Sequence, residues 1–195
     1  MLNNWTFVGV SGITNGGKTS LLKYLQKVIP DCVVLHQDDF FRSEFDENHV
    51  MIPELNHANW EALSSVDWEK MQDAITACTS QQPAGQKLMI IDGHIIFNHP
   101  RLAKLFDKRY FLTLTREECY ARRLTRTYEP PDVPGYFEKV VWPMYLKNLQ
   151  EVKDTQPDIT YLDGTEDMDI LHKKVLEDLQ KFLKGRSDIH RSLNP

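Results

Sequence analysis

Cysteine is scarce in this chain of 195 residues, which contains only Cys32, Cys78 and Cys119. Three cysteines cannot all pair with one another, and their spacing fits no metal-ligand pattern, so we expect free thiols in a reducing compartment. Long apolar runs are missing too, since no segment approaches the ~20 apolar residues that a membrane-spanning helix requires. The sequence therefore argues against a disulfide-rich secreted fold and against a membrane protein.

Positive charge is also scarce, because the chain has 23 Lys and Arg residues against 28 Asp and Glu residues, which gives a net charge of −5. A general nucleic-acid surface requires a basic face, so we expect no nucleic-acid partner. The N-terminus has no basic segment followed by a long apolar core, so we expect no cleaved leader. Length and composition predict one domain over residues 1–195, which we expect to be a cytoplasmic monomer, with the nucleus as the alternative compartment.

A glycine-rich segment near the N-terminus is the first feature that points to a function. The phosphate loop, as we call it, is Gly12-Ile13-Thr14-Asn15-Gly16-Gly17-Lys18-Thr19, followed by Ser20. It has the phosphate-binding pattern of a glycine, four residues, then glycine, lysine and a hydroxyl residue. In such a loop, backbone N–H groups surround the phosphates, the lysine contacts the β- and γ-phosphates and the hydroxyl binds Mg²⁺. The segment therefore predicts a site for a nucleoside triphosphate with Mg²⁺.

Strand-like and helix-like segments alternate through the rest of the chain. Apolar runs predict strands at 4–10, 32–36, 88–91, 110–114 and 159–162. Helical spacing predicts helices from the phosphate loop to about residue 30 and at 60–78, 116–127, 136–153 (bent at Pro143) and 170–183. This alternation predicts an α/β fold of the P-loop NTPase type, a three-layer sandwich in which helices flank a parallel five-stranded sheet.

The remaining segments lack regular spacing. Residues 42–59 predict an irregular loop on the substrate side. Residues 122–135 end in a stretch with three prolines, which cannot be regular, and they predict a small lid. Residues 81–85 predict a turn, and the polar tail 185–195 predicts a frayed end.

Acidic residues follow two of the predicted strands. Asp38 and Asp39 come directly after the strand at 32–36, and Asp92 directly after the strand at 88–91. In an open parallel sheet these strand ends face the ligand crevice. A carboxylate there can accept the proton of an attacking hydroxyl and contact Mg²⁺. A turn or N-cap acid is the alternative interpretation, and for Asp92 it has nearly equal weight.

An arginine cluster leads into the predicted lid. Arginine supplies a fixed counter-charge for phosphoryl transfer, although a charged helix face is the commoner meaning of such a cluster. The cluster consists of Arg122, Arg123 and Arg126. Its position before the lid favours the functional interpretation.

Two aromatic residues, Trp60 and Tyr128, flank the irregular segments and can line a pocket for a flat ring. The histidines have no ligand spacing, and we expect structural roles for His94 and His99.

Seven segments resemble those of nicotinamide riboside kinases, within the uridine kinase-like group of phosphate-loop kinases. Besides the phosphate loop they are Gln37–Phe41, Asn59–Glu61, Ile91–Gly93, Arg122–Tyr128, Pro130–Phe137 and Val141–Leu146. The resemblance covers nearly the whole chain, and residues 122–146 carry most of it. It implies transfer of the γ-phosphoryl group of ATP to the 5′-hydroxyl of nicotinamide riboside, with nicotinic acid riboside as a further substrate, in NAD biosynthesis.

The resemblance also implies roles for the site residues. Asp38 is the general base and shares Mg²⁺ with Thr19, and Lys18 and Asp92 assist catalysis. Trp60 and Tyr128 sandwich the cationic nicotinamide ring, which an aromatic face attracts. Glu61 and Arg123 bind the ribose. The other acceptor-site residues are Asp39, Phe40 and Phe41. The other nucleotide-site residues are Arg122, Arg126, Thr127, Tyr128, Glu166, Asp167 and Met168, and the last three lie near the adenine.

Two positions depart from the family pattern, which commonly has aspartate at Glu61 and glutamate at Asp92. Both positions keep an acid, so the chemistry is retained while the fine substrate preference stays open. A uridine or cytidine kinase is the first alternative, because the aromatic pair would also stack a pyrimidine. A non-catalytic nucleotide-binding switch is the second, and the lack of an Asn-Lys-x-Asp motif argues against it.

Overall fold

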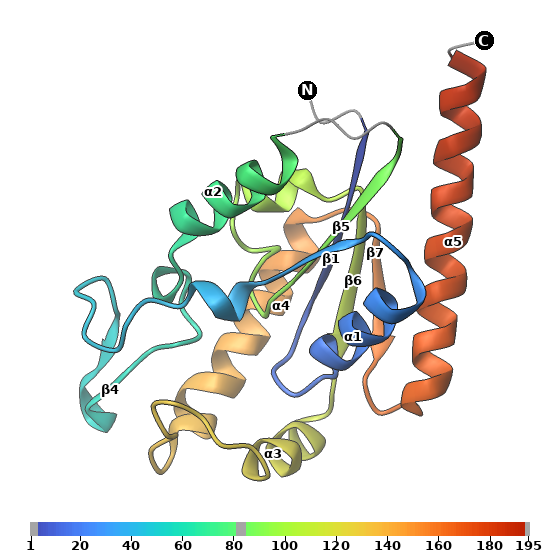
Figure 1. Cartoon of the computed structure of the whole chain (residues 1–195). Coiled ribbons are helices and arrows are strands. Elements are labelled where there is room, and N and C mark those ends of the chain that lie inside the picture. The colour runs from blue at the N-terminus through green and yellow to red at the C-terminus, as the bar shows by residue number, and fades with distance from the viewer. Residues whose placement is uncertain (1–3, 81–84, 194–195) are drawn as a thin grey trace.

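A parallel sheet forms the centre of the molecule (Figure 1). The structure is a computed structural model that describes residues 4–80 and 85–193, so residues 81–84 of the expected turn lie outside it. The sheet has five strands in the order β2-β5-β1-β6-β7, and all neighbours are parallel. The strands are β1 (Trp5–Gly12), β2 (Val33–His36), β5 (Lys87–Asp92), β6 (Lys108–Thr113) and β7 (Ile159–Asp163). The predicted strands are all present, with bounds that differ by one or two residues.

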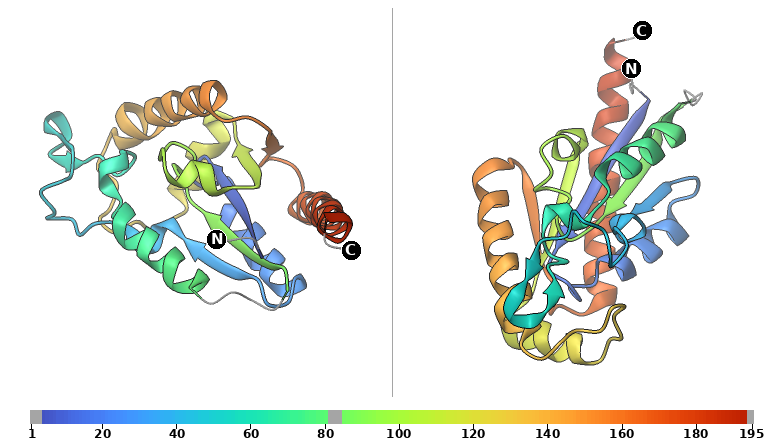
Figure 2. Two further views of the ribbon diagram at one scale, coloured as in Figure 1. Left: turned by 90° about the horizontal axis from the view of Figure 1, so that it is seen from above. Right: turned by 90° about the vertical axis from the view of Figure 1, so that its left-hand side faces the viewer.

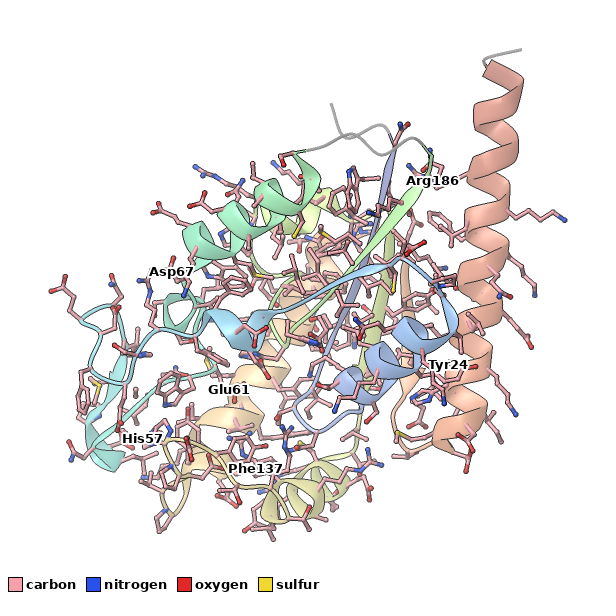
Figure 3. All side chains as sticks on the ribbon, viewed as in Figure 1. Tyr24, His57, Glu61, Asp67, Phe137 and Arg186 are labelled. Atoms are coloured by element: carbon pink, nitrogen blue, oxygen red, sulfur yellow. The ribbon has the colours of Figure 1, made fainter. Side chains whose placement is uncertain are left out.

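Helices cover both faces of this sheet (Figure 2). They are α1 (Lys18–Val28), α2 (Trp68–Thr79), α3 (Arg116–Leu124), α4 (Trp142–Thr155) and α5 (Met168–Leu193). Helices α1 and α5 pack on one face, where Tyr24 stacks on His172 with ring centroids 4.9 Å apart (Figure 3). Helices α2, α3 and α4 pack on the other face. The predicted three-layer α/β sandwich is confirmed.

Alternation along the strands divides the apolar side chains between two cores. In β1, Val8 and Val10 face the leucines of α1, whereas Phe7 faces the core under α2 and α4. Fully burying a leucine or valine contributes about 1.5–3 kcal/mol, so these two cores hold the sheet between its helices. The carboxyl ends of β1, β2 and β5 are thereby fixed side by side.

Helix α2 begins later than predicted, at Trp68 in place of Trp60. Asp67 caps it by accepting a hydrogen bond from the backbone N–H of Lys70, at 3.0 Å. Before the cap, the chain forms the short 3₁₀ turn η3 (Leu63–Ser65), and Ser65 Oγ donates to the carbonyls of Trp60 and Ala62. The side-chain hydrogen bonds of Ser65 and Asp67 compete with a helix, and the sequence periodicity does not reveal them.

Residues 42–59 are more regular than predicted. They contain a small antiparallel pair, β3 (Met51–Ile52) and β4 (His57–Ala58), joined by the 3₁₀ turn η2 (Pro53–Leu55). Asn56 adopts φ 44°, a left-handed conformation that asparagine tolerates better than most residues. A further 3₁₀ turn, η1 (Gln37–Phe40), follows β2, and another, η4 (Leu102–Leu105), precedes β6.

Two helix predictions near the C-terminus need correction. The bend expected at Pro143 is a π-helical turn just before it, η5 (Phe137–Val141), after which α4 restarts with Pro143 in its first turn. Proline is tolerated there because its missing N–H would have no partner in the helix. Helix α5 continues to Leu193, through the tail expected to fray, and Arg186 binds Asp107 at the end of the sheet (Figure 3). Over residues 4–80 and 85–193, no helix combines the length and apolar character needed to cross a membrane.

Candidate active site

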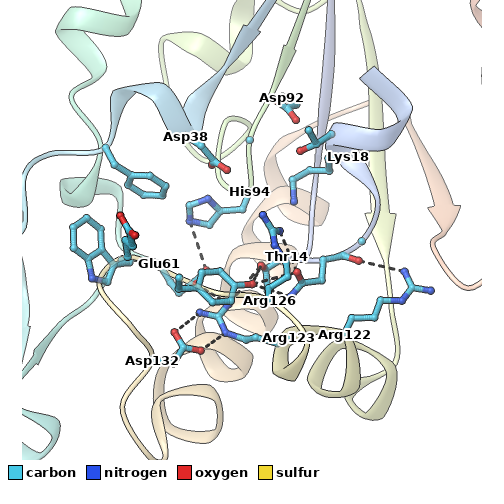
Figure 4. A pocket seen from close by; sticks show the side chains of 18 of the residues that line it. Thr14, Lys18, Asp38, Glu61, Asp92, His94, Arg122, Arg123, Arg126 and Asp132 are labelled. Carbon is cyan, nitrogen blue, oxygen red and sulfur yellow. Dashed lines mark hydrogen bonds and ion pairs between the residues drawn. The ribbon is translucent and has the colours of Figure 1, made fainter. Parts of the chain in front are cut away.

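A cavity of about 940 Å³ opens at the carboxyl ends of the strands (Figure 4). The phosphate loop and the start of α1 form one wall, and the lid forms another. The turn after β5 and the segment around Trp60 close the remaining side. Most of the segments that the sequence singled out therefore meet around one space, although the residues that line it are spread from Thr14 to Tyr136.

The glycines of the phosphate loop are required by its backbone path. Gly12 has φ +123°, and a Cβ there would lie 2.1 Å from the carbonyl oxygen of Leu112. Gly17 has φ +100° and forms the N-cap of α1. Lys18 Nζ donates to the carbonyls of Gly12 and Ile13, at 2.9 and 2.8 Å. Burial lowers the pKa of Lys18, while the carboxylates of Asp38, Asp92 and Glu61 act in the opposite direction.

The lid contacts the tip of the phosphate loop through Asn15. Its Nδ2 donates to the hydroxyl of Tyr128 at 3.0 Å, and its Oδ1 accepts from Arg126 Nη1 at 3.1 Å. Its backbone carbonyl accepts from Arg122 Nη1 at 3.2 Å. Three residues of the predicted lid therefore hold one loop residue, and two of them are arginines that can face a phosphate.

Two carboxylates line the cavity near Lys18. Asp38 lies in η1 and is exposed, whereas Asp92 is buried at the end of β5. Asp92 Oδ1 lies 2.7 Å from Nδ1 of His36. Burial raises the pKa of Asp92, and the neighbouring His36 and Lys18 partly oppose this rise. The exposed Asp38 is thus available to an incoming hydroxyl, while Asp92 is already engaged with His36.

A buried glutamate, Glu61, and a buried arginine, Arg123, define the other end of the cavity. Burial raises the pKa of Glu61 to about 7, against the lowering effect of Arg123 and Lys18. Arg123 Nη1 lies 3.9 Å from Glu61 Oε1. The same guanidinium binds Asp132 through Nε and Nη2, and its centre lies 4.2 Å from the ring centroid of Tyr128. Arg123 is therefore fixed from two sides.

Trp60 is held in place by its surroundings. Its backbone N–H donates to the hydroxyl of Tyr136 at 2.9 Å, and its ring lies edge-on to those of Phe41 and His49. The indole Nε1 is buried and has no hydrogen-bond partner. Trp60 and Tyr128 both line the cavity, so a flat ring placed there would meet both side chains.

Not every predicted site residue borders the cavity. Those that do are Thr14, Asn15, Gly16, Gly17, Lys18, Thr19, Ser20, Asp38, Phe41, Trp60, Glu61, Asp92, Arg122, Arg123, Arg126 and Tyr128. Phe40 instead packs in the core with α2, because η1 turns its ring away from the cavity and under the sheet face. Two exposed residues, Asp39 and Thr127, are not in the cavity wall.

The predicted adenine segment lies at the start of α5, outside the cavity wall. Asp167 caps this helix by accepting from the backbone N–H groups of Asp169 and Ile170. Glu166 lies 3.2 Å from Lys174 Nζ. Met168 lies beside the phosphate loop, its sulfur 3.9 Å from the point that a Cβ on Gly17 would occupy.

Several residues of the cavity wall were not foreseen as site residues, among them Arg42, His94, Asp132 and Tyr136. His94 was expected to be structural, yet its ring lies in the pocket (Figure 4). Its position two residues after Asp92, at the end of a predicted strand, was the one available signal. Asp132 and Tyr136 act through contacts with Arg123 and Trp60, which no spacing in the sequence reveals.

Comparisons with known proteins agree with this geometry. A family model described as an AAA domain matches residues 8–143. Nicotinamide riboside kinase 1 of Rattus norvegicus is 42% identical over 197 residues, covering 94% of this chain and 99% of the relative. Nicotinamide riboside kinase 2 of Homo sapiens is 38% identical over 194 residues, covering 92% and 83%. A uridine kinase of Streptococcus thermophilus is only 21% identical over 208 residues, covering 91% and 97%.

The solved structures support the fold. A sugar kinase from Janibacter sp. HTCC2649 superimposes with a TM-score of 0.58 at 14% identity, covering 90% of this chain and 94% of the other. This likeness concerns the architecture alone, whereas the sequence relatives match nearly end to end. The chain belongs to the nicotinamide riboside kinase family of phosphate-loop kinases.

Proposed function

We propose that this protein is an ATP-dependent nucleoside kinase that phosphorylates the 5′-hydroxyl of nicotinamide riboside and yields the mononucleotide. The observation that carries the proposal is the 42% identity to a nicotinamide riboside kinase over almost the whole of both chains. The cavity supports it, because a phosphate loop lies at one end and an aromatic, acidic pocket lies at the other. Such a reaction supplies a step of NAD biosynthesis.

The phosphate end fits ATP. The loop glycines leave the backbone free to approach a phosphate, and the N-terminus of α1 adds its dipole. Lys18 would exchange its two carbonyl partners for the β- and γ-phosphates. Arg122 and Arg126 border the same space and can supply counter-charge to the transferred group.

The donor set also fits Mg²⁺ carried in with the nucleotide. Among the described residues, no three His, Cys, Asp or Glu side chains cluster to hold a metal by themselves. Mg²⁺ in kinases is bound by one or two protein oxygens together with phosphate oxygens and water, and the hydroxyl of Thr19 and the carboxylate of Asp38 would serve. When bound, the ion neutralises charge on the phosphates.

Asp38 is the base in this proposal. It is exposed to the cavity, whereas Asp92 is buried against His36. The 5′-hydroxyl would give its proton to Asp38 as its oxygen attacks the γ-phosphorus and the bond to ADP breaks. Asp92 would act indirectly, because it holds His36 and adds negative charge near Lys18.

The acceptor end accounts for the substrate. The nicotinamide ring of the riboside is cationic, and Trp60 and Tyr128 offer aromatic faces to it. Glu61 and Arg123 would bind the ribose hydroxyls, with Phe41 completing the apolar wall. Nicotinic acid riboside shares the ribose and the ring, so we include it as a second substrate.

A uridine or cytidine kinase is the alternative from the same group. The uridine kinase relative shares half the identity of the nicotinamide riboside kinase, which favours the latter. Rates of ADP release with nicotinamide riboside, uridine and cytidine as separate acceptors test the choice. Equal or higher rates with either pyrimidine nucleoside would contradict the proposed substrate.

The setting of the enzyme completes the proposal. We place it in the cytoplasm as a monomer that needs neither membrane nor nucleic acid. All three cysteines are free thiols, which suits a reducing compartment, and the net charge of −5 does not attract nucleic acid.

A further inference from the structure

His94 has a buried ring nitrogen that faces the active-site cavity without a hydrogen-bond partner. The residue follows Asp92 and Gly93 at the end of β5, and its side chain is 13% exposed. Its Nε2 lies 3.6 Å from Glu61 Oε2, beyond hydrogen-bonding distance. Most buried polar atoms in native proteins have a partner, so an unpaired one in an active site needs a physical reason.

Gln37 determines which nitrogen of His94 carries the proton. Gln37 is fully buried, and its Oε1 accepts a hydrogen bond from the backbone N–H of Ile95 at 3.2 Å. Its Nε2 is 2.9 Å from His94 Nδ1, and an amide nitrogen can only donate. Nδ1 is therefore an acceptor, and the proton of the neutral ring is on Nε2, the nitrogen that faces Glu61.

The surroundings keep this ring neutral and its support rigid. Burial, together with the positive charges of Lys18 and Arg123, lowers the pKa of His94 to about 3, although the backbone of Trp60 acts in the opposite direction. Gly93 leaves the room that Gln37 needs, since a Cβ there would lie 2.4 Å from Gln37 Oε1. His94 thus presents a fixed N–H donor to the cavity.

Glu61 lies between two such donors. One carboxylate oxygen, Oε1, is 3.9 Å from Arg123 Nη1, and the other, Oε2, is 3.6 Å from His94 Nε2. Arg123 is held by Asp132, as His94 is held by Gln37. Glutamate has one more rotatable bond than aspartate, so a single donor leaves its carboxylate less well fixed.

We infer that His94 is a positioning residue for the acceptor nucleoside, whose Nε2–H orients the Glu61 carboxylate to accept hydrogen bonds from the ribose hydroxyls. The inference rests on the proposed function only in that Glu61 contacts the ribose. Nicotinamide riboside, uridine and cytidine all contain this ribose. It can therefore be tested with whichever of these acceptors the protein phosphorylates.

Two substitutions of His94 separate positioning from packing. His94→Phe keeps a buried aromatic ring beside Phe41 and removes the donor, whereas His94→Gln places an amide N–H close to the position of Nε2. We expect His94→Phe to raise KM for the acceptor about tenfold and to leave KM for ATP within about twofold, with His94→Gln recovering most of the loss. Unchanged acceptor KM, or an equal rise in both constants, would overturn the inference.

A double-mutant cycle tests whether His94 acts through Glu61. In a Glu61→Ala background, His94→Phe should cause no further rise in the acceptor KM, because the carboxylate that it positions is gone. Independent, additive effects of the two substitutions would contradict the role assigned to His94.

The tautomer can be measured without any turnover. In nitrogen-15 NMR of the wild-type protein, His94 is identified by the signal that disappears in His94→Phe, and this signal should show the neutral Nε2–H form throughout the range from pH 6 to 8. A neutral Nδ1–H form or a protonated ring would overturn the inference. If none of the acceptors is phosphorylated, the proposed function fails, and the positioning role fails with it, while this spectrum still tests whether His94 presents an Nε2–H donor.

Discussion

The two ends of the active-site cavity differ in how their polar groups are satisfied. At the phosphate end, Lys18 binds two backbone carbonyls and Asn15 binds lid residues. At the acceptor end, the indole Nε1 of Trp60 and Nε2 of His94 are buried without partners. An unsatisfied buried polar group costs about 1–3 kcal/mol. The two unpaired groups at the acceptor end therefore lower the free energy of unfolding of the free protein, and a ligand that pairs with them can regain that free energy.

This difference matches the ligand that each end of the cavity binds. Triphosphate is recognised largely by backbone N–H groups and a few cations, which many phosphate-loop proteins share. A nucleoside is recognised by side chains in a dry pocket, where an unpaired group penalises the wrong ligand. Specificity in this enzyme should therefore depend on the acceptor end.

The largest effect is expected from the base between the two ends. Asp38→Ala should lower kcat by roughly 10²–10⁴-fold, because no other exposed carboxylate in the described cavity wall is as well placed to take the hydroxyl proton. The Kd for ATP, measured by calorimetry, should change by less than about threefold. Asp73→Ala, an exposed aspartate on α2, serves as the control. A fully active Asp38→Ala would move the base to Asp92.

A large effect confined to the acceptor end is expected from Trp60. Trp60→Ala should raise KM for nicotinamide riboside roughly 5–30-fold, the equivalent of about 1–2 kcal/mol of cation–π attraction, and spare KM for ATP. Trp60→Phe should recover part of the loss. Trp68→Phe is the matched control, since Trp68 stacks on His99 outside the cavity. A rise in KM for ATP alone would contradict the division between the ends.

The burial of Glu61 at the acceptor end should also make the free energy of unfolding depend on pH. Because the folded-state pKa of Glu61 is raised to about 7 from 4.5, the unfolded chain loses this proton first as pH rises. Glu61 therefore lowers the free energy of unfolding progressively between about pH 4.5 and 7. Glu61→Gln should stabilise the protein by up to about 3 kcal/mol at pH 8 and by little at pH 4.5, in urea unfolding. A uniform effect across this range would refute the assignment.

The smallest effect is expected where the two ends meet. Tyr128→Phe keeps the aromatic face and removes the hydroxyl that binds Asn15. Losing one such hydrogen bond should raise KM for ATP about 2–10-fold, while KM for nicotinamide riboside stays close to wild type. The reverse pattern would show that Tyr128 contributes to the acceptor end through its hydroxyl.

The fold was predictable because its main features are periodic in the sequence. Apolar runs and helical spacing gave every strand of the main sheet and every helix. The errors lie where local interactions override periodicity. The side-chain hydrogen bond of Asp67 delays the start of α2, and the left-handed backbone of Asn56 permits the turn between β3 and β4. The extended α5 escaped prediction because a polar helix end has no apolar stripe to reveal it.

The site was predictable only in part. Residues fixed by a motif or a strand end, such as Lys18, Asp38 and Asp92, line the cavity as expected. Phe40 does not, because adjacent residues of a 3₁₀ turn point in different directions and one sequence cannot say which faces inward. His94 escaped for a related reason, since its importance depends on Gln37 and Glu61, which only the fold brings to it.

The central claim is that the acceptor end selects a nucleoside with a cationic ring. Its most direct test is a coupled assay of ADP release with nicotinamide riboside, nicotinic acid riboside, uridine and cytidine as separate acceptors. We predict a kcat/KM for nicotinamide riboside well above the values for both pyrimidine nucleosides. A higher value for uridine or cytidine, or no ADP release with any of the four, would contradict the claim.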